Sequence, residues 1–484
     1  MTSPHPETAP TCRIVAFQPG AVPAAPVPGL EDIWLRLHDL LTHLRLTRLD
    51  EGAVQSQQRG MIRDGCFLMP SPFAGRPADL CCRSWSHEFQ FYYEFDAGPH
   101  GTYFWISSML DRGFSLDAAW FPSRQVAVTN YPSQLDAGRL ERFSQVLAQA
   151  PFKPAWPAPW INVPRSAVVG FQHFMHMLWN ELPALDRLAS AGLPGAAPPT
   201  TFSIAVRHEP FGPMHELFPE LAPWMQALRH EDVPAWNAAH GLVLGLGSWS
   251  ITPGTQDRVL RVAAHHASVA ALARQAAFKE AHDPVFWLSV KPPKRTPSNQ
   301  PAMLAGLIRA LRTEHPKAGI ILDGASIPWD FPANTNYPPW FHAMSHTAVT
   351  GSAVIISMVL ALLDPATRTH VVALNGLTAC EEATWSGLAT FYVCHGGTMQ
   401  NKIGWLHRVP GFIHSNLTFL SFARMMPPPI PGGPTCHYAS DRLIVDDDPS
   451  RYLPHDLARK DQNYSFMSLD LLVEEVRAAF LTSG

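Results

Sequence analysis

Short apolar runs alternate with amphipathic helical segments through the second half of this chain. The runs at residues 285–290, 319–324 and 371–374 are typical of buried strands, and residues 300–315 and 354–363 between them have helical spacing. Strands that are joined in this way by helices pair in parallel, with helices on both faces of the sheet. The pattern therefore predicts an α/β fold.

The same alternation begins near residue 165, with a single long helix predicted at residues 256–282. Upstream, the aromatic and β-branched runs 89–95 and 102–106 predict a β-hairpin. The proline-rich stretch 151–164 resembles a linker. We predict an N-terminal α+β accessory region, two Rossmann-like domains, and a C-terminal loop with a closing helix, at residues 1–150, 165–282, 283–425 and 426–484.

The composition narrows the class of protein. Among 484 residues, 36 are basic and 40 acidic, and a net charge of −4 gives no reason to expect nucleic acid as a partner. Seven scattered cysteines without a CxxC pair fit a reduced, cytoplasmic protein, and the start of the sequence shows no secretion signal. The apolar run 353–363 is too short to span a bilayer and is predicted as a buried helix, which leaves peripheral membrane contact open.

A glycine pair joins a strand to a helix within residues 391–402. Residues 391–394 predict a buried strand, Gly396 and Gly397 a turn, and a helix-compatible run follows. Glycines let the backbone approach an anion, and the first amides of a helix point at it. Four side chains would add donors around the same phosphate: His395, Thr398, Asn401 and Lys402. The alternative is an ordinary strand-to-helix turn with a free imidazole.

Three further polar clusters follow predicted strands, at the ends where doubly wound sheets bind ligands. Lys291 and Arg295 suit a diphosphate, or belong to a solvated basic loop. Asp323 accepts from a base or ribose hydroxyl, or simply makes a turn. Glu381 binds ribose hydroxyls, or stabilises the start of a helix. Four such clusters at successive strand ends favour a site for a nucleotide diphosphate.

The earlier Rossmann-like half supplies a candidate general base. His173, His176 and Asn180 lie at i, i+3 and i+7 on one face of a helix predicted at residues 171–191. A histidine near the positive end of a helix tends to stay neutral and can accept a proton, so His173 is the candidate base. The alternative is two partly buried histidines of an amphipathic helix. We expect no metal here, because no third ligand is spaced near the two histidines.

Several functional motifs are missing from the sequence. It contains no GxGxxG, GxxxxGK[ST] or HExxH pattern, which leaves dinucleotide, P-loop and zincin sites without support. Apart from the acidic run 446–448 in a predicted loop, it has no DxD triplet. That absence weakens the case for a metal-dependent sugar-nucleotide site.

Taken together, these segments resemble bacterial glycosyltransferases of the GT-B architecture, namely capsule and glycan transferases related to plant xylan-decorating enzymes. Residues 173–185 are similar to their HW…LP.L helix, residues 394–401 to their HGAGLTN turn, and residues 287–300 to their R…R…N strand and loop. Phe174 replaces the tryptophan of the first motif, and Gly397-Thr398 replaces Ala-Gly in the second. The resemblance covers roughly residues 165–420.

The resemblance implies two Rossmann-like domains that face a cleft. It implies an inverting, metal-independent transfer of a sugar from a nucleotide-sugar co-substrate, without a further cofactor, to a hydroxyl of a glycan or protein, as in polysaccharide biosynthesis or protein glycosylation. Through the first motif it adds Glu181 to the catalytic candidates His173 and His176.

An acceptor groove would need exposed aromatic side chains, which residues 84–130 offer for stacking on sugars: Trp85, Tyr92, Tyr93, Tyr103 and Trp105. The alternatives are a sugar-nucleotide epimerase or hydrolase on the same scaffold, a non-catalytic sugar- or nucleotide-binding protein, and a structural partner in a surface-assembly complex.

Overall fold

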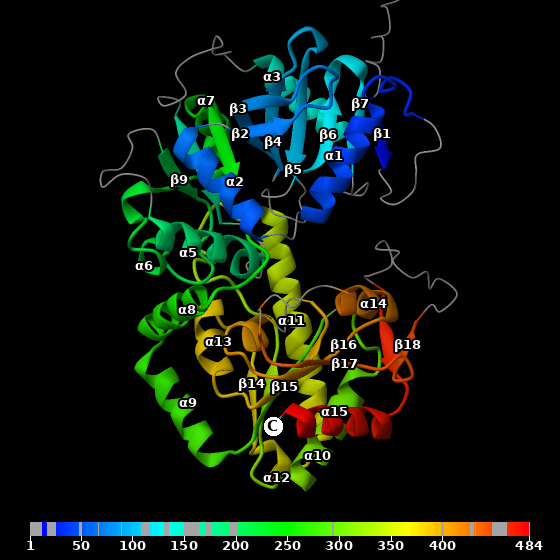
Figure 1. Ribbon diagram of the computed structural model, residues 1–484. Coiled ribbons are helices and arrows are strands. Elements are labelled where there is room, and N and C mark those ends of the chain that lie inside the picture. The colour runs from blue at the N-terminus through cyan, green and yellow to red at the C-terminus, as the bar shows by residue number, and fades with distance from the viewer. Residues whose placement is uncertain are drawn as a thin grey trace, which may run out of the picture. The chain divides into compact units, whose positions relative to one another are not determined.

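The protein divides into two compact units, which are Met1–Arg207 with Phe218–Trp249, and His208–Leu217 with Ser250–Gly484 (Figure 1). The computed structural model describes residues 12–16, 26–47, 51–65, 67–88, 90–107, 116–129, 135–149, 164–170, 176–192, 202–292, 295–397, 401–425, 430, 432–447 and 462–483. The predicted linker lies outside these residues apart from its last position.

A seven-stranded sheet occupies the N-terminal part of the first unit. Its elements are β1 (Arg13–Ala16), α1 (Trp34–Thr47), α2 (Glu51–Asp64), β2 (Phe67–Pro70), β3 (Ala78–His87), β4 (Gln90–Asp96), β5 (Thr102–Ser107), β6 (Leu116–Phe121), β7 (Val126–Thr129) and α3 (Ala137–Gln149). The strand order is β1-β7-β6-β5-β4-β3-β2, antiparallel except for the β1–β7 pair. Strands β4 and β5 form the predicted hairpin, with Tyr93 opposite Trp105.

The aromatic side chains of this sheet form its core. Trp85, Tyr92, Tyr93, Tyr103 and Trp105 are each 5% exposed or less. Tyr92, for example, stacks on Phe143 of α3 with ring centroids 3.7 Å apart. Burying such large side chains is a main source of stability in a domain of this kind, so they are not free to stack on a ligand. The prediction that these five residues line an acceptor groove is therefore wrong.

A four-stranded parallel sheet completes the first unit. Its strands are β8 (Arg165–Val169), β9 (Phe202–Val206), β10 (Met225–Ala227) and β11 (Leu242–Gly245), in the order β10-β9-β8-β11, and its helices are α5 (Leu182–Ala191) and α7 (Val233–Ala239). Ser84 of β3 joins the two sheets, because its hydroxyl donates to the Val243 carbonyl (2.5 Å) and accepts from the Val243 amide (2.8 Å).

The second unit is built on a six-stranded sheet that is parallel throughout. Its strands are β12 (Val285–Ser289), β13 (Gly319–Asp323), β14 (Val371–Leu374), β15 (Phe391–His395), β16 (Gly411–His414) and β17 (Cys436–Tyr438). They lie in the order β14-β13-β12-β15-β16-β17. Counted from β12, this is the order 3-2-1-4-5-6 of a dinucleotide-binding sheet, with the change of direction between β12 and β15. The small antiparallel pair β18 (Ile444–Asp446) and β19 (Tyr464–Phe466) follows.

Helices cover both faces of this sheet. The helices of the second unit are α6 (Met214–Leu217), α8 (Pro253–His266), α9 (Val269–Ala281), α10 (Gln300–Glu314), α11 (Pro339–Leu362), α12 (Pro365–Arg368), α13 (Ala379–Ser386), α14 (Leu417–Met425) and α15 (Leu469–Ser483). Phe286 and Leu288 of β12 face a core with α10, α11 and α15, whereas Val285 and Trp287 face a core that includes α13. This alternation explains why the four residues Val285–Leu288 are all apolar.

The predicted α/β class is confirmed, with two parallel Rossmann-like sheets and an additional N-terminal α+β region. A cleft between the two units stays a prediction, as do the functional roles of the predicted domains.

The helix predicted at residues 256–282 is in fact two helices, α8 and α9. Ser268 has an extended backbone and its hydroxyl accepts the amide of Ala271, so it caps the start of α9. Serine is among the best residues for this position, and the cap overrides the helical propensity on either side.

Helix α11 is longer and more exposed than predicted. It begins at Pro339, a residue favoured in the first turn of a helix, and has 24 residues without a charged side chain. Ile356 and Val359 of α11 pack in the core, but only 17% of the most apolar 18-residue stretch of α11 is buried, and Met358 is half exposed. The prediction of a buried helix is therefore wrong. Length and composition alone would allow α11 to cross a membrane, as they do for many core helices, and the absence of a membrane-spanning segment stays a prediction.

Candidate functional site

The predicted anion-binding residues gather where the sheet of the second unit changes direction. Strands β12 and β15 are neighbours in the sheet, and their carboxyl ends lead into Lys291 and into His395-Gly396-Gly397 respectively. In open parallel sheets, ligands bind outside the carboxyl ends of the strands at this change of direction. The topology therefore brings together two clusters that are about a hundred residues apart in the sequence.

His395 is the most informative side chain at this edge. It is 1% exposed, and its Nε2 has no hydrogen-bond partner among the residues that the structure describes. The Ser289 hydroxyl accepts the His395 amide (3.1 Å) and lies 3.3 Å from Nδ1. A hydroxyl that accepts one hydrogen can still donate its own, and donation to Nδ1 leaves the proton of a neutral ring on Nε2. A buried N–H without a partner is costly, and such groups commonly mark a ligand site.

The charge state of His395 is set by its surroundings. Burial lowers its pKa well below the usual value, and the nearby cations Lys291 and Arg295 lower it further. The ring is therefore neutral at pH 7 and acts as a hydrogen-bond donor, not as a cation. The positive charge at this edge has to come from the lysine and the arginine.

The glycine pair allows close packing beside the imidazole. A Cβ at Gly396 would lie 2.5 Å from the Phe419 ring, which is too close for any other residue. Gly397 has a φ of +125°, and the Arg295 guanidinium lies beside it, 3.6 Å from where a Cβ would stand. The same guanidinium lies 4.6 Å from the centroid of Phe419. The glycines thus permit an arginine and an aromatic ring to pack directly against the turn.

The main chain of the basic loop is fixed at its start. The Gln300 side chain accepts from the Lys291 amide (2.8 Å) and donates to the Lys291 carbonyl (2.9 Å). Arg295 holds a left-handed backbone with a φ of +54°, which is uncommon for a residue other than glycine. Gln300 therefore fixes the backbone at the Lys291 end of the loop, and residues 293–294 lie outside the described part of the chain.

Lys402 and Asp323 occupy a buried charge cluster. The Lys402 ammonium lies 3.1 Å from Asp323 and 2.5 Å from Glu382, and the Trp287 indole donates to Asp323 (3.0 Å). Burial raises the pKa of Glu382 to about 8, with Lys402 opposing the shift. Lys402 pairs with both carboxylates, although Glu382 Oε1 has no hydrogen-bond partner among the described residues, and the three groups connect β13, α13 and the segment after the glycine turn. Direct contact of Lys402 or Asp323 with a nucleotide stays a prediction.

The other predicted donor-site residues have mixed outcomes. Glu381 accepts from the backbone amide and the hydroxyl of Thr378, and together they form a capping box at the start of α13. That is the structural alternative which the sequence left open. Asn401 begins a π-helical turn, Asn401–Trp405. Thr398 and the side chain of Asn401 lie outside the described residues.

The catalytic candidates belong to the first unit. His173 lies outside the described residues. His176 Nδ1 lies 3.2 Å from Asn180 Oδ1, as their shared helical face predicts, and Asn180 donates to the Ser248 carbonyl (2.7 Å). Glu181 is buried and accepts the Gly170 amide (2.8 Å), which ties the π-helical turn Met177–Glu181 to the end of β8. Catalytic roles for His176 and Glu181 stay predictions.

Sequence reasoning missed the roles of three residues of the site region. Ser289 was visible as the last residue of a strand, but its pairing with His395 depends on the strand order. His414, opposite His395 on β16, lies 2.6 Å from the Tyr464 hydroxyl, and burial lowers its pKa to about 3. Glu382 was considered only as one of the Glu381-Glu382 pair at a predicted helix start, and its buried ion pair with Lys402 depends on the fold.

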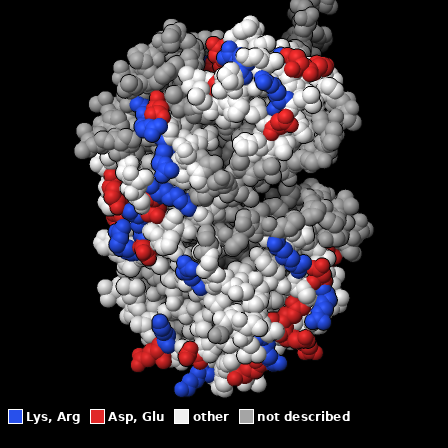
Figure 2. All heavy atoms as spheres, viewed as in Figure 1, with Lys and Arg blue, Asp and Glu red and all other residues white. Residues whose placement is uncertain are grey.

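The surface charge does not point to a ligand by itself. Figure 2 shows basic and acidic side chains interspersed over the described residues on the face in view. An anion would therefore have to be held by a local cluster, such as the one at the carboxyl ends of β12 and β15.

No protein-family model matches the chain, and no curated protein matches its sequence. One solved structure of low similarity is the E. coli ADP-heptose LPS heptosyltransferase II, with 11% identity over 66% of this chain and 99% of that one and a TM-score of 0.38. Another is a family 9 glycosyl transferase from Veillonella parvula, with 10% identity over 67% of this chain and 99% of that one and a TM-score of 0.34. A third is the E. coli heptosyltransferase WaaC with ADP-2-deoxy-2-fluoro heptose, with 11% identity over 61% of this chain and 98% of that one and a TM-score of 0.25. Such similarities assign no activity to this chain, and the relation to xylan-decorating enzymes stays a prediction.

Proposed function

We propose that this protein is a glycosyltransferase whose second unit binds a nucleotide-diphosphate sugar at the carboxyl ends of β12 and β15. The observation that carries the proposal is the buried Nε2 of His395, which has no partner among the described residues and lies at the change of direction of a 3-2-1-4-5-6 sheet beside two cations. A diphosphate supplies both the acceptor oxygens and the negative charge that such a site would balance.

The chemistry assigned to the site is the stabilisation of a leaving group. In the transfer, an acceptor hydroxyl oxygen forms a bond to the anomeric carbon, and the bond from that carbon to the phosphate oxygen breaks. The diphosphate departs with the bonding electron pair. Lys291 and Arg295 balance its charge, and the neutral His395 ring donates a hydrogen bond, so these side chains take the part that a divalent cation has in metal-dependent transferases.

We assign the acceptor proton to a base in the first unit. His173 is the proposed base, with His176 and Glu181 as supporting residues. Direct attack by the acceptor would invert the configuration at the anomeric carbon. The proposed acceptor is a hydroxyl of a glycan or protein, and the proposed compartment is the cytoplasm.

The test begins with a thermal-shift and calorimetric screen of the full chain against UDP, ADP, GDP, CMP and dTDP. A nucleotide that binds only the folded protein raises its melting temperature. We expect at least one nucleoside diphosphate to bind, and Lys291→Ala or Arg295→Ala to weaken it. With the matching nucleotide sugar, His173→Ala should bind the donor and fail to transfer. Binding of none of these nucleotides would refute the proposal, and transfer by His173→Ala at the parental rate would refute the assigned base.

A further inference from the structure

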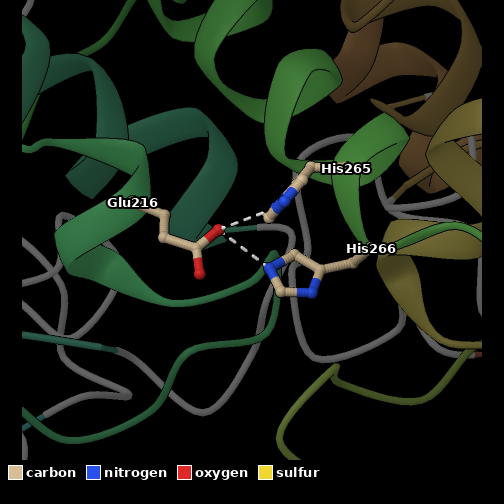
Figure 3. A group of neighbouring side chains, drawn as sticks. All are labelled: Glu216, His265 and His266. Atoms are coloured by element: carbon tan, nitrogen blue, oxygen red, sulfur yellow. Dashed lines mark hydrogen bonds and ion pairs between the residues drawn. The ribbon is translucent and has the colours of Figure 1, made fainter.

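A second cluster of ligating side chains lies in the second unit, outside the proposed donor site. It consists of Glu216 on α6 and the adjacent pair His265 and His266 at the end of α8 (Figure 3). One ligand atom from each residue lies within 4.8 Å of the other two. None of the three residues takes part in the proposed transfer.

Both imidazoles contact the same carboxylate oxygen, Oε2 of Glu216. His266 Nε2 lies 2.9 Å and His265 Nδ1 lies 3.4 Å from Glu216 Oε2. In a tetrahedral zinc site, with metal–ligand distances of about 2.0–2.2 Å, neighbouring ligand atoms are about 3.4 Å apart. The two distances to Glu216 are within about half an ångström of that spacing, and the two imidazole nitrogens lie within 4.8 Å of each other, so the three atoms could surround one ion after adjustment of the side chains.

The main chain that carries Glu216 is already held against α8. Arg258 donates to the Leu217 carbonyl (2.9 Å) and Arg261 to the Glu216 carbonyl (3.2 Å). Gly212, with a φ of +106°, lets this segment approach α8 so closely that a Cβ there would lie 2.5 Å from a Val262 methyl carbon. Because these contacts fix both elements, binding an ion would require little ordering of the backbone.

The exposure of the three side chains fits a site that an ion can enter from solvent. His266 and Glu216 are 23% and 29% exposed, and His265 is 73% exposed. Trp329 packs near His266, with ring centroids 5.2 Å apart, and covers one side of that imidazole. Two histidines and one glutamate form a ligand set that zinc uses in proteins, with a fourth position left for water.

We propose that Glu216, His265 and His266 bind one divalent transition-metal ion, with Zn²⁺ as the best match. The ion would connect α6 to the end of α8. It would thereby secure the segment His208–Leu217, which packs with the second unit although the chain on both sides of it belongs to the first.

The test is a calorimetric titration of ZnCl₂ into the tag-free full chain at pH 7.5, after treatment with a chelator. We expect one high-affinity equivalent per chain. Since outer-shell partners alone change metal affinity about 10- to 100-fold, loss of a direct ligand in His266→Ala or Glu216→Gln should weaken binding by more than about 100-fold. His346→Ala is the matched control, because His346 is an exposed histidine of α11 outside the cluster. It should bind like the parent.

Co²⁺ provides a second readout that does not depend on heat signals. Bound by these ligands in a four-coordinate site, it should give intense visible absorption that is lost in Glu216→Gln, while the circular dichroism spectrum of that variant stays parental. Failure of the parent to bind Zn²⁺, or equal affinity in the parent and in both ligand variants, would overturn the proposal. In that case the cluster is an ion pair between protonated histidine and carboxylate only.

Discussion

Replacing His395 by asparagine should separate its proposed role in binding from its role in packing. An asparagine amide corresponds to the Nδ1 side of the ring and can keep the contact with Ser289, which lies 3.3 Å from Nδ1. It has no counterpart of Nε2. A glutamine amide reaches towards the Nε2 position and retains that donor. The pair His395→Asn and His395→Gln therefore removes or keeps the one buried N–H on which the proposed diphosphate site depends.

The expected size of the effect follows from one hydrogen bond to a charged acceptor. Such a bond contributes about 1.5–3 kcal/mol, which corresponds to a loss of about 10- to 150-fold in affinity. His395→Asn should weaken binding of the nucleoside diphosphate by that factor, and His395→Gln by clearly less. Because the pKa of His395 is far below neutral, the loss should be similar at low and high salt, whereas the loss in Arg295→Ala should shrink as salt is added.

Isothermal titration calorimetry with the nucleotide selected in the screen measures these constants. Circular dichroism and the melting temperature show whether each variant is folded. The reasoning would be refuted if folded His395→Asn bound the nucleotide as tightly as the parent, or if His395→Gln lost as much affinity as His395→Asn.

Three further changes test the surroundings of the site. Gly396→Ala places a Cβ 2.5 Å from the Phe419 ring, so it should lower the unfolding free energy by about 1–3 kcal/mol and also weaken nucleotide binding. A parental unfolding free energy together with parental nucleotide affinity would contradict the close packing. Glu382 has its pKa raised to about 8 from 4.5, so the folded chain keeps a proton that the unfolded chain loses, and the unfolding free energy should fall between about pH 4.5 and 8. Glu382→Gln should remove up to about 5 kcal/mol of that decline in denaturant titrations, since each pKa unit corresponds to about 1.4 kcal/mol, and an unchanged decline would argue against the raised pKa. Burial lowers the pKa of His414 to about 3 from 6.5, so the contribution of this residue to the unfolding free energy is complete above pH 6.5 and is lost towards pH 3, by about 1.4 kcal/mol per pH unit. The stability of His414→Gln should therefore be less sensitive to acid than that of the parent. Equal sensitivity would exclude the lowered pKa of His414.

Four of the six strands of the second unit were predicted from the sequence, and three of these, β12, β13 and β15, are buried at every position. The first four residues of Val285–Ser289 are therefore all apolar, and the strand stands out from the amphipathic helices around it. The order of the strands was not predictable from periodicity. It is this order, with β12 beside β15, that places Ser289 against His395 across 106 positions of the sequence.

The candidate site was predictable in location and less so in the role of each residue. A cation after a glycine turn fits a phosphate ligand, yet Lys402 pairs with Asp323, which is 79 positions away, and with Glu382. Aromatic residues gathered in residues 84–130 fit a platform for sugars, yet Tyr92 and Trp105 are fully buried. In each case the tertiary partner decides the role, and nothing in the local sequence identifies that partner.

A crystal structure of the full chain with the bound nucleoside diphosphate tests the central claim most directly. The account predicts a phosphate oxygen within about 2.7–3.2 Å of His395 Nε2, with the diphosphate at the carboxyl ends of β12 and β15 and the Arg295 guanidinium beside it. A nucleotide bound elsewhere, with His395 Nε2 donating to a protein group instead, would contradict it.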